Sequence, residues 1–367
     1  MELPRVVVAI LDFFEFLWTL FTADSPKPIP PVDLHLSTKP FRLLHLPSLA
    51  RDVIFSHMEI EDIYHLSKCS RRSRCAVKMF TRRQKYYFEI TTDKSHCSFK
   101  ISKYSEWKCF NRGWRPMEIR RPLAGDSLST HSEDYWAATK KEIVYLFDVF
   151  TKKVNWLMFH DVTNVRNMTE LLKEKTLLPT DWVWYDVREI DDEMYKYVLR
   201  EFKDAKNLSI FASPSAGFRY DDMEPFTGDE ISIMNADWLT VDHLTRCFTN
   251  VENVWLWTPS RRCLNVLVFN EFLNAWRNGL RVGNLDLWCG WANLDLQTIF
   301  KNVPTTEVKR VQVGNKKRVF NDGECFLIRQ EESGVEALVY FIFKATLVNR
   351  LVCFTTNFRL LNDEESD

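Results

Sequence analysis

Carboxylate side chains that could act as general acids and bases occur in three short groups along the chain. The groups are Asp191–Asp192–Glu193, Asp221–Asp222 with Glu224, and Asp229–Glu230. A catalytic carboxylate pair needs a cleft that separates the two pKa values, so that one group stays protonated while the other is ionised. All three groups lie in polar stretches, where solvated loops and helix starts are typical. We therefore interpret them as structural and expect no acid–base catalysis from them.

Cysteine and histidine, the residues most used in metal and redox sites, are widely spaced. The nine cysteines stand at positions 69, 75, 97, 109, 247, 263, 289, 325 and 353, and no two form a C-x-x-C pair. Secreted disulfide frameworks are denser, and structural zinc sites need paired short spacings. His243 and Cys247 are four residues apart and would share one helix face, which we interpret as packing. The sequence predicts reduced thiols and no metal.

Motifs of nucleotide-binding and hydrolytic enzymes are absent from the sequence. It contains no G-x-x-x-x-G-K-[ST], G-x-G-x-x-G, G-x-S-x-G or H-E-x-x-H. With 10 glycines in 367 residues, the chain has few places where bare backbone can approach a phosphate group. We expect a protein that is not an enzyme and needs no cofactor.

The composition is that of a folded chain rich in aromatic residues. Hydrophobic residues make up 46% and charged residues 27%, which excludes a disordered tail protein, a coiled-coil rod and a multi-span membrane protein. The length predicts about two to three domains. The 49 basic and 50 acidic side chains give a net charge of −1, so no overall field attracts nucleic acid or a membrane.

The basic side chains are nevertheless concentrated in one region. Residues 41–90 hold 10 Lys and Arg against 5 Asp and Glu, and most of this excess lies between residues 71 and 85. Two interpretations of this basic cluster remain open. It faces an acidic partner or water, or it binds nucleic acid with Tyr86, Tyr87 and Phe88 as stacking residues.

Residues 1–39 form an apolar segment followed by a proline-rich linker. The stretch 6–21 is almost wholly apolar, but Asp12 and Glu15 interrupt it. It is shorter than the roughly 20 residues of a membrane span, and each central acid is costly in a bilayer. We expect it to dock as a helix on the rest of the protein, with membrane association as the alternative. The prolines of residues 25–31 predict a domain boundary.

The segment after this linker predicts three short helices. Apolar residues recur at helical spacing over 48–58, a second helix follows the acidic pair at 61–62, and Ser70 is a candidate N-cap of a third helix. About 40 residues rarely bury a sufficient core alone. We therefore expect part of the apolar surface to contact a partner.

The same segment resembles an F-box. Residues 41–49 match the pattern F-x-L-x-x-L-P-x-L, and residues 66–70 match its L-S-x-C-S ending. The resemblance covers about residues 40–80 and implies binding to the Skp-type adaptor of a cullin–RING ubiquitin ligase. The residues that it places in the apolar contact with the adaptor are Leu46, Pro47, Leu49, Ile54, Met58, Ile63 and Leu66.

A β-like region follows this segment. Alternating patterns at 86–91 and 98–102 predict two strands, and residues 122–127 predict a loop. Residues 139–150 begin with charged side chains and continue with bulky apolar ones. The simplest interpretation of this stretch is a helix that leads into a strand.

The middle of the chain repeats an Asn-apolar-x-apolar pattern at 207–210, 253–256 and 284–287. The second spacing is near the length of a leucine-rich repeat. Apolar residues at helical spacing precede each copy, and Gly279 follows the last helix at a position suited to left-handed backbone. This alternation predicts a parallel, irregular, leucine-rich-repeat-like β/α stack.

A second resemblance concerns this region. Residues 270–279 match the signature N-x-F-L-x-x-W-x-x-G of the type-2 F-box-associated domain, which follows F-boxes of the nematode type. Residues 237–244 are also similar to that family. The two resemblances together cover about residues 40–355 and imply that the second domain recruits a protein target.

The last part of the chain predicts an antiparallel sheet, with strand-like stretches at 308–313, 325–329, 337–343 and 351–354. The whole is expected to be mixed α/β. Residues 40–85 form a three-helix F-box, residues 86–358 form the β/α stack with its C-terminal sheet, and residues 359–367 form an acidic tail.

The expected function is that of a substrate-receptor subunit of a Skp–cullin–F-box ubiquitin ligase, located in the cytoplasm, the nucleus or both. Its F-box would dock the Skp-type adaptor, and its C-terminal domain would recruit an unknown protein target. The alternative is a non-enzymatic scaffold or nucleic-acid-binding protein that uses the basic cluster at 71–85.

Overall fold

The computed structural model describes residues 43–94, 96–103, 117–122, 132–150, 153–177, 181–188, 190–258, 266–280, 282–289, 295–343 and 350–361. The chain divides into two compact units. The first unit comprises residues 1–89 with 97–153, and the second comprises 90–96 with 154–367. The predicted N-terminal helix and most of the loop at 122–127 lie outside the described residues. Of the predicted tail at 359–367, residues 359 and 360 belong to a strand instead, and residues 362–367 lie outside the described residues.

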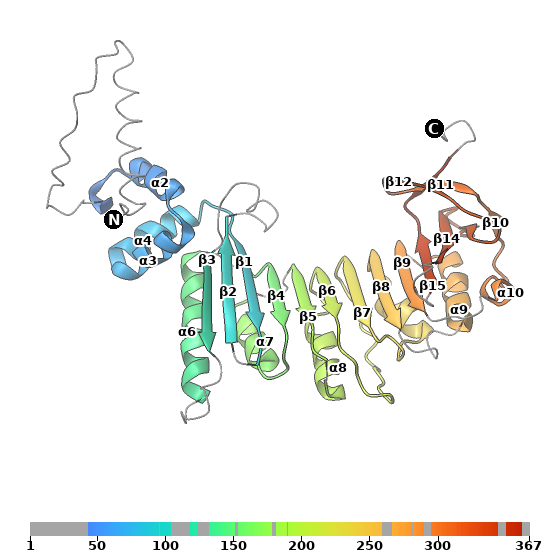
Figure 1. The fold of residues 1–367 in the computed structure, drawn as a ribbon, viewed down its shortest axis with the longest axis horizontal. Coiled ribbons are helices and arrows are strands. Elements are labelled where there is room, and N and C mark those ends of the chain that lie inside the picture. Colours follow the sequence, from blue (N-terminus) through green and yellow to red (C-terminus); the bar gives the residue numbers. More distant parts are fainter. Residues whose placement is uncertain are drawn as a thin grey trace, which may run out of the picture. The chain divides into compact units, whose positions relative to one another are not determined.

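The first unit begins with the three predicted helices, preceded by the short 3₁₀ turn η1 (Leu43–His45) (Figure 1). They are α2 (Ser48–His57), α3 (Ile60–Cys69) and α4 (Arg71–Thr81). The predicted cap is confirmed, since the Ser70 hydroxyl accepts a hydrogen bond from the backbone N–H of Ser73 at 3.1 Å. One apolar face from each helix meets in a small core, in which the rings of Phe55 and Phe80 pack edge to face.

Three strands and a long helix follow, and they belong to the first unit except for residues 90–96. The strands are β1 (Tyr87–Thr92), β2 (His96–Ser102) and β3 (Met117–Pro122), in that order across the sheet. The helix is α6 (Ser132–Val149), so the prediction that 139–150 turns from helix into strand is wrong. The bulky residues of this stretch recur at helical spacing, and Ile143, Leu146 and Phe147 are buried on one face. Their β propensity is overridden by that packing.

Six short parallel strands form the centre of the second unit and lie side by side in chain order (Figure 1). They are β4 (Trp156–Phe159), β5 (Trp182–Tyr185), β6 (Asn207–Ile210), β7 (Glu230–Met234), β8 (Asn253–Thr258) and β9 (Asn284–Cys289). The predicted parallel stack is therefore confirmed. The asparagine pattern identified β6, β8 and β9 but not the other three strands.

Helices lie in four of the five connections between these strands, and the connection from β6 to β7 has none. They are α7 (Val165–Glu174), α8 (Asp192–Glu201), the π-helical turn η2 (His243–Cys247) and α9 (Val266–Arg277). Gly279 follows α9 with a φ of +107°, which confirms the predicted left-handed position. Trp276 on α9 is 1% exposed and packs against Phe354 with ring centroids 5.1 Å apart, as expected for a core residue.

Antiparallel strands extend the sheet beyond β9, as predicted. In order they are β15 (Arg350–Thr355), β14 (Glu336–Phe343), β13 (Cys325–Arg329) and the short β10 (Thr306–Glu307). The short helix α10 (Leu296–Ile299) precedes β10. A separate three-stranded sheet has the order β12 (Lys316–Val319), β11 (Arg310–Val313) and β16 (Phe358–Leu360).

Candidate functional site

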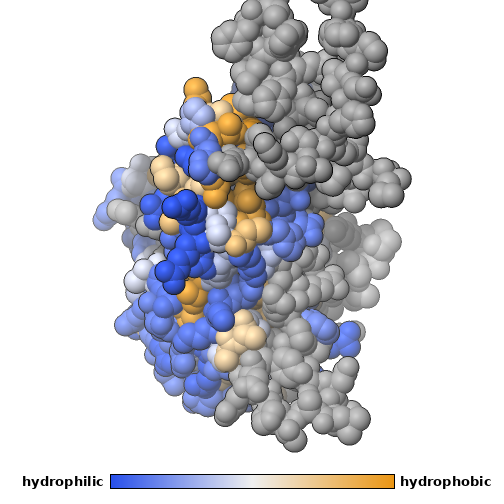
Figure 2. All heavy atoms as spheres, turned by 90° about the vertical axis from the view of Figure 1, so that its left-hand side faces the viewer, coloured by the Kyte–Doolittle hydropathy of each residue, from blue (hydrophilic) through white to orange (hydrophobic). Residues whose placement is uncertain are grey.

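A surface groove of about 850 Å³ runs between η1, α3 and α4 of the first unit. Its apolar lining residues are Leu43, Leu44, Leu66, Ala76 and Met79, and its basic ones include Arg51, Arg71 and Arg72. On the side of the molecule drawn in Figure 2, apolar side chains gather directly beside strongly hydrophilic ones. An apolar groove with a cationic rim is suited to binding another protein rather than to chemistry.

Two large apolar side chains in this region are strongly exposed to solvent. Leu49 at the start of α2 is 77% exposed, and Met79 on α4 is 53% exposed. Pro47, just before Leu49, is also exposed. Such side chains gain free energy when a partner removes them from water, at roughly 25 cal/mol per Å² of apolar area.

The structure divides the seven residues that the sequence placed in the adaptor contact. Ile54, Met58 and Ile63 are 2%, 5% and 0% exposed and belong to the core of the three helices. Of the other four, Leu66 lines the groove, Pro47 and Leu49 are exposed, and Leu46 is half-buried. The buried residues therefore support this surface from beneath, and only the other four are accessible to a partner in the chain as it stands.

Sequence reasoning missed the groove residues Leu43, Leu44 and Met79 as contact candidates. A signal was present on α4, where Ser73, Ala76, Val77 and Phe80 form the buried face. Cys75 and Met79 are four residues apart and out of phase with that face, and both are exposed. A second apolar row on a short helix indicates a second contact surface.

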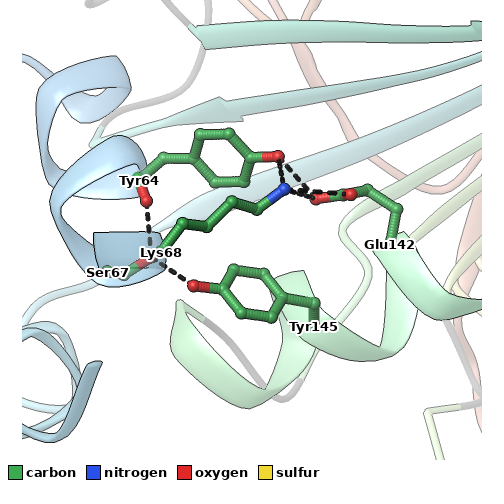
Figure 3. A network of polar contacts seen from close by, with 5 residues as sticks. All are labelled: Tyr64, Ser67, Lys68, Glu142 and Tyr145. Atoms are coloured by element: carbon green, nitrogen blue, oxygen red, sulfur yellow. Dashed lines mark hydrogen bonds and ion pairs between the residues drawn. The ribbon is translucent and has the colours of Figure 1, made fainter. Parts of the chain in front are cut away.

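A polar network fixes α3 to α6 within the first unit (Figure 3). The Lys68 ammonium donates to both carboxylate oxygens of Glu142, at 3.0 and 3.1 Å, and the Tyr64 hydroxyl donates to Oε1 at 2.6 Å. Lys68 also contacts the Tyr64 hydroxyl directly. One turn further, the hydroxyls of Ser67 and Tyr145 lie 2.6 Å apart.

Burial and these hydrogen bonds shift the ionisation of the two donors. Burial, and secondly the hydrogen bond to Glu142, raise the pKa of Tyr64 above its ordinary value. Burial alone would lower the pKa of Lys68, but its hydrogen bonds to Tyr64 and Glu142 raise it above the ordinary value. Both groups therefore stay protonated and serve as donors at neutral pH.

Helix α4 is joined to α6 as well. Lys78 and Asp148 form an ion pair at 2.5 Å, and the Thr81 hydroxyl donates to the carbonyl of Val149. The Arg74 guanidinium lies over the ring of Tyr145, 4.2 Å from its centroid. Helices α3 and α4 are thus both anchored to α6.

The acidic groups considered for catalysis are structural where the structure gives them contacts. Asp191 caps α8 by accepting from the N–H of Met194 at 2.7 Å. Asp192 accepts from the hydroxyl and N–H of Ser215, and these bonds lower the pKa of its carboxyl. A helix start was the predicted role of this group.

His243 and Cys247 are packed, as predicted. His243 is buried, with Nε2 2.7 Å from the carbonyl oxygen of Tyr220 and Nδ1 2.8 Å from the hydroxyl of Thr240. The Cys247 thiol points at the carbonyl of Asp222. Among the residues that the structure describes, no three His, Cys, Asp or Glu side chains are grouped as a metal site would need.

Comparison with known proteins identifies one family in this chain. Residues 43–85 match the F-box domain family, so the groove and the three helices lie in an F-box domain. No curated protein and no solved structure matches the chain. In the described part of the chain, no helix has both the length and the apolar character needed to cross a bilayer.

Proposed function

We propose that this protein is the substrate-receptor subunit of a Skp–cullin–F-box ubiquitin ligase. The observation that carries the proposal is the F-box domain at 43–85, because F-box domains bind Skp-type adaptors of cullin–RING ligases. The exposed apolar residues and the groove supply a surface of the kind that such binding requires.

The adaptor contact is formed by accessible apolar residues of the F-box. Of the residues named from the sequence, Leu46, Pro47, Leu49 and Leu66 contact the adaptor, and Met79 extends their surface along the groove. The basic rim faces acidic side chains of the adaptor and speeds the encounter between the two proteins. Ile54, Met58 and Ile63 keep the helices at the spacing that presents this surface.

The rest of the chain is proposed to recruit the target. We assign residues 86–358 to a type-2 F-box-associated domain, and the helix and left-handed glycine at 266–279 support this assignment. The ligase then works by proximity, since the receptor holds a lysine of the target near the charged conjugating enzyme. The receptor performs no chemistry of its own in this mechanism.

The test is co-purification of the full-length protein with the Skp-type adaptor. The double substitution Leu46→Ala with Pro47→Ala is expected to lower adaptor affinity by more than about 30-fold, because anchor residues of interfaces typically contribute 2 kcal/mol or more. Val319→Ala, which shortens a side chain that is 78% exposed in the second unit, is the matched control. Unchanged adaptor binding in the double variant refutes the F-box contact.

A nucleic-acid-binding function of the basic cluster is not favoured by the structure. Of the three expected stacking residues, Tyr86 and Phe88 are 7% and 0% exposed and Tyr87 is half-buried. Several of the cations have partners within the chain, including Lys78 with Asp148 and Arg83 with Asp52. Because two of the three rings are buried, the cluster lacks the row of exposed aromatic side chains on which single strands stack.

A further inference from the structure

The parallel strands of the second unit have one covered face. Because β4 to β9 follow one another in chain order, right-handed crossovers place every connecting helix on the same side. The side chains on that side are 0–2% exposed; they are Leu157, Phe159, Val183, Tyr185, Leu208, Ile210, Ile231, Ile233, Val254, Leu256, Leu285 and Leu287. Contact between Phe159 and Phe202, which directly follows α8, confirms that a helix packs there.

The opposite face of these strands is rich in tryptophan. Six of the chain's 13 tryptophans occupy it: Trp156, Trp182, Trp184, Trp255, Trp257 and Trp288. The indoles of Trp156 and Trp182 stack with centroids 5.5 Å apart, and those of Trp257 and Trp288 with centroids 5.9 Å apart. Trp255 and Trp257 on β8 remain 42% and 40% exposed, which is unusual for the largest apolar side chain.

The charges on this face are acidic. Among the outward positions of β4 to β9, the charged residues are Glu230 and Asp286. Asp286 lies in register beside Trp255, whose other neighbour is Ser232. Burial raises the pKa of both carboxyl groups, so each gains from a cationic neighbour.

Beyond β9, the same face of the sheet is covered by another part of the chain. There the sheet of β11, β12 and β16 covers it through a cluster that includes Val311, Tyr340 and Cys353, against which Trp288 packs. The guanidinium of Arg318 on β12 lies over the ring of Tyr340, 5.6 Å from its centroid. Burial raises the pKa of Asp286, and the nearby charge of Arg318 partly offsets this effect. The cover is thus made of extended strands that bring apolar side chains and an arginine.

We propose that the face from β4 to β8 binds an extended, arginine-bearing segment of the target protein. This inference rests on the proposed function, in which residues 86–358 recruit the target. Guanidinium groups stack on indole faces and pair with carboxylates, so Trp255, Trp257 and Glu230 recognise them by complementary chemistry. Nucleic acid is not expected to bind this face, because the carboxylates of Glu230 and Asp286 would repel its phosphates.

The experiment uses the full-length protein and a fluorescein-labelled, end-capped 12-residue peptide of alternating arginine and serine, followed by fluorescence anisotropy. We expect saturable binding that weakens about ten-fold or more in the double variant Trp255→Ala with Trp257→Ala. Leu267→Ala on helix α9, 52% exposed, is the matched control and leaves binding unchanged. A lysine–serine peptide of equal charge binds more weakly, since lysine stacks less well on indole.

Several results would overturn the proposal. They are equal binding by the double tryptophan variant, absence of saturable binding, equal affinity for the lysine peptide, or preference for a glutamate–serine peptide or a single-stranded RNA. If circular dichroism shows that the double variant is unfolded, Glu230→Gln and Trp255→Leu decide in its place, each with an expected loss of about three-fold or more. Adaptor co-purification stays intact in all these variants, so failure of this surface is distinguishable from failure of the F-box contact.

Discussion

At the scale of single residues, two of the donors that join α3 to α6 share one acceptor. The carboxylate of Glu142 receives hydrogen bonds from Lys68 and Tyr64 and is largely buried. A buried donor that loses its acceptor keeps the cost of desolvation without the compensating bond. Glu142 is therefore more critical than either of its two donors, because both lose their partner when it is removed.

Glu142→Ala is expected to lower the free energy of unfolding by about 1–3 kcal/mol, measured by urea denaturation at neutral pH. A loss near the lower limit is expected if the bond to Lys68 contributes little, because this side chain is 37% exposed and water screens its charge. Glu332→Ala, at an exposed position of the second unit, is the control and changes stability by less than about 0.5 kcal/mol.

The same substitution has a pH signature. The folded pKa values of Tyr64 and Lys68 lie above their ordinary values of 10.0 and 10.5. The stability that they contribute is fully present below pH 10 and is lost as the pH rises through the folded pKa values. The difference between wild type and Glu142→Ala should therefore shrink as the pH rises above these ordinary values, and a constant difference would contradict the network.

At the scale of elements, α9 shows how one helix holds the second unit together. Its buried residues Phe272 and Trp276 both pack on Phe354 of β15, so the helix joins the parallel strands to the antiparallel ones. The carbonyl of Trp276 also accepts a hydrogen bond from the side chain of Gln330 at 2.9 Å. The indole is core and not a binding platform.

Trp276→Ala is expected to destabilise the second unit by about 3–5 kcal/mol, because it leaves a large cavity in a packed core. Thermal unfolding monitored by circular dichroism measures the loss. Adaptor co-purification should survive, since the F-box belongs to the other unit. Leu267→Ala on the exposed side of the same helix is the control, and loss of adaptor binding in the tryptophan variant would contradict the separation of the two functions.

Elements with a clean periodic pattern were predictable, and those without one were not. An asparagine begins each of β6, β8 and β9. Its side-chain amide can form a hydrogen bond with the neighbouring strand, as Asn284 Nδ2 does to Asn253 Oδ1 at 2.9 Å. Strand β4 reads Trp-Leu-Met-Phe and is apolar on both faces, so no alternation reveals it. The Lys68–Glu142 pair spans 74 residues, and no local pattern reports such a contact.

At the scale of the whole molecule, the F-box shares its compact unit with residues up to 153. Several links run from its helices to α6, among them Lys68 to Glu142, Lys78 to Asp148, and Thr81 to the carbonyl of Val149. No local pattern predicts that α6, which begins at residue 132, returns to an F-box that ends at residue 85. The adaptor surface is consequently held by a scaffold larger than the F-box match.

A chain that ends at residue 85 is therefore expected to be less stable than one that ends at residue 153. We expect a midpoint of thermal unfolding about 10 °C or more lower for the shorter chain, because it loses these links and the apolar cover of α6. Both chains begin at residue 36, and calorimetry compares them. Equal midpoints would show that the F-box folds without support from α6.

The two-residue strand β10 limits how the sheet of the second unit can grow. It pairs with β13 at the outer edge of the antiparallel strands and presents only Thr306 and Glu307. An edge so short and partly charged offers little backbone for another chain to join, which protects against edge-to-edge aggregation. Parallel strands form slowly because their contacts are distant in sequence, so newly made chains spend time with open edges. Once the sheet is complete, β10 therefore leaves other copies of the chain little backbone on which to add a strand.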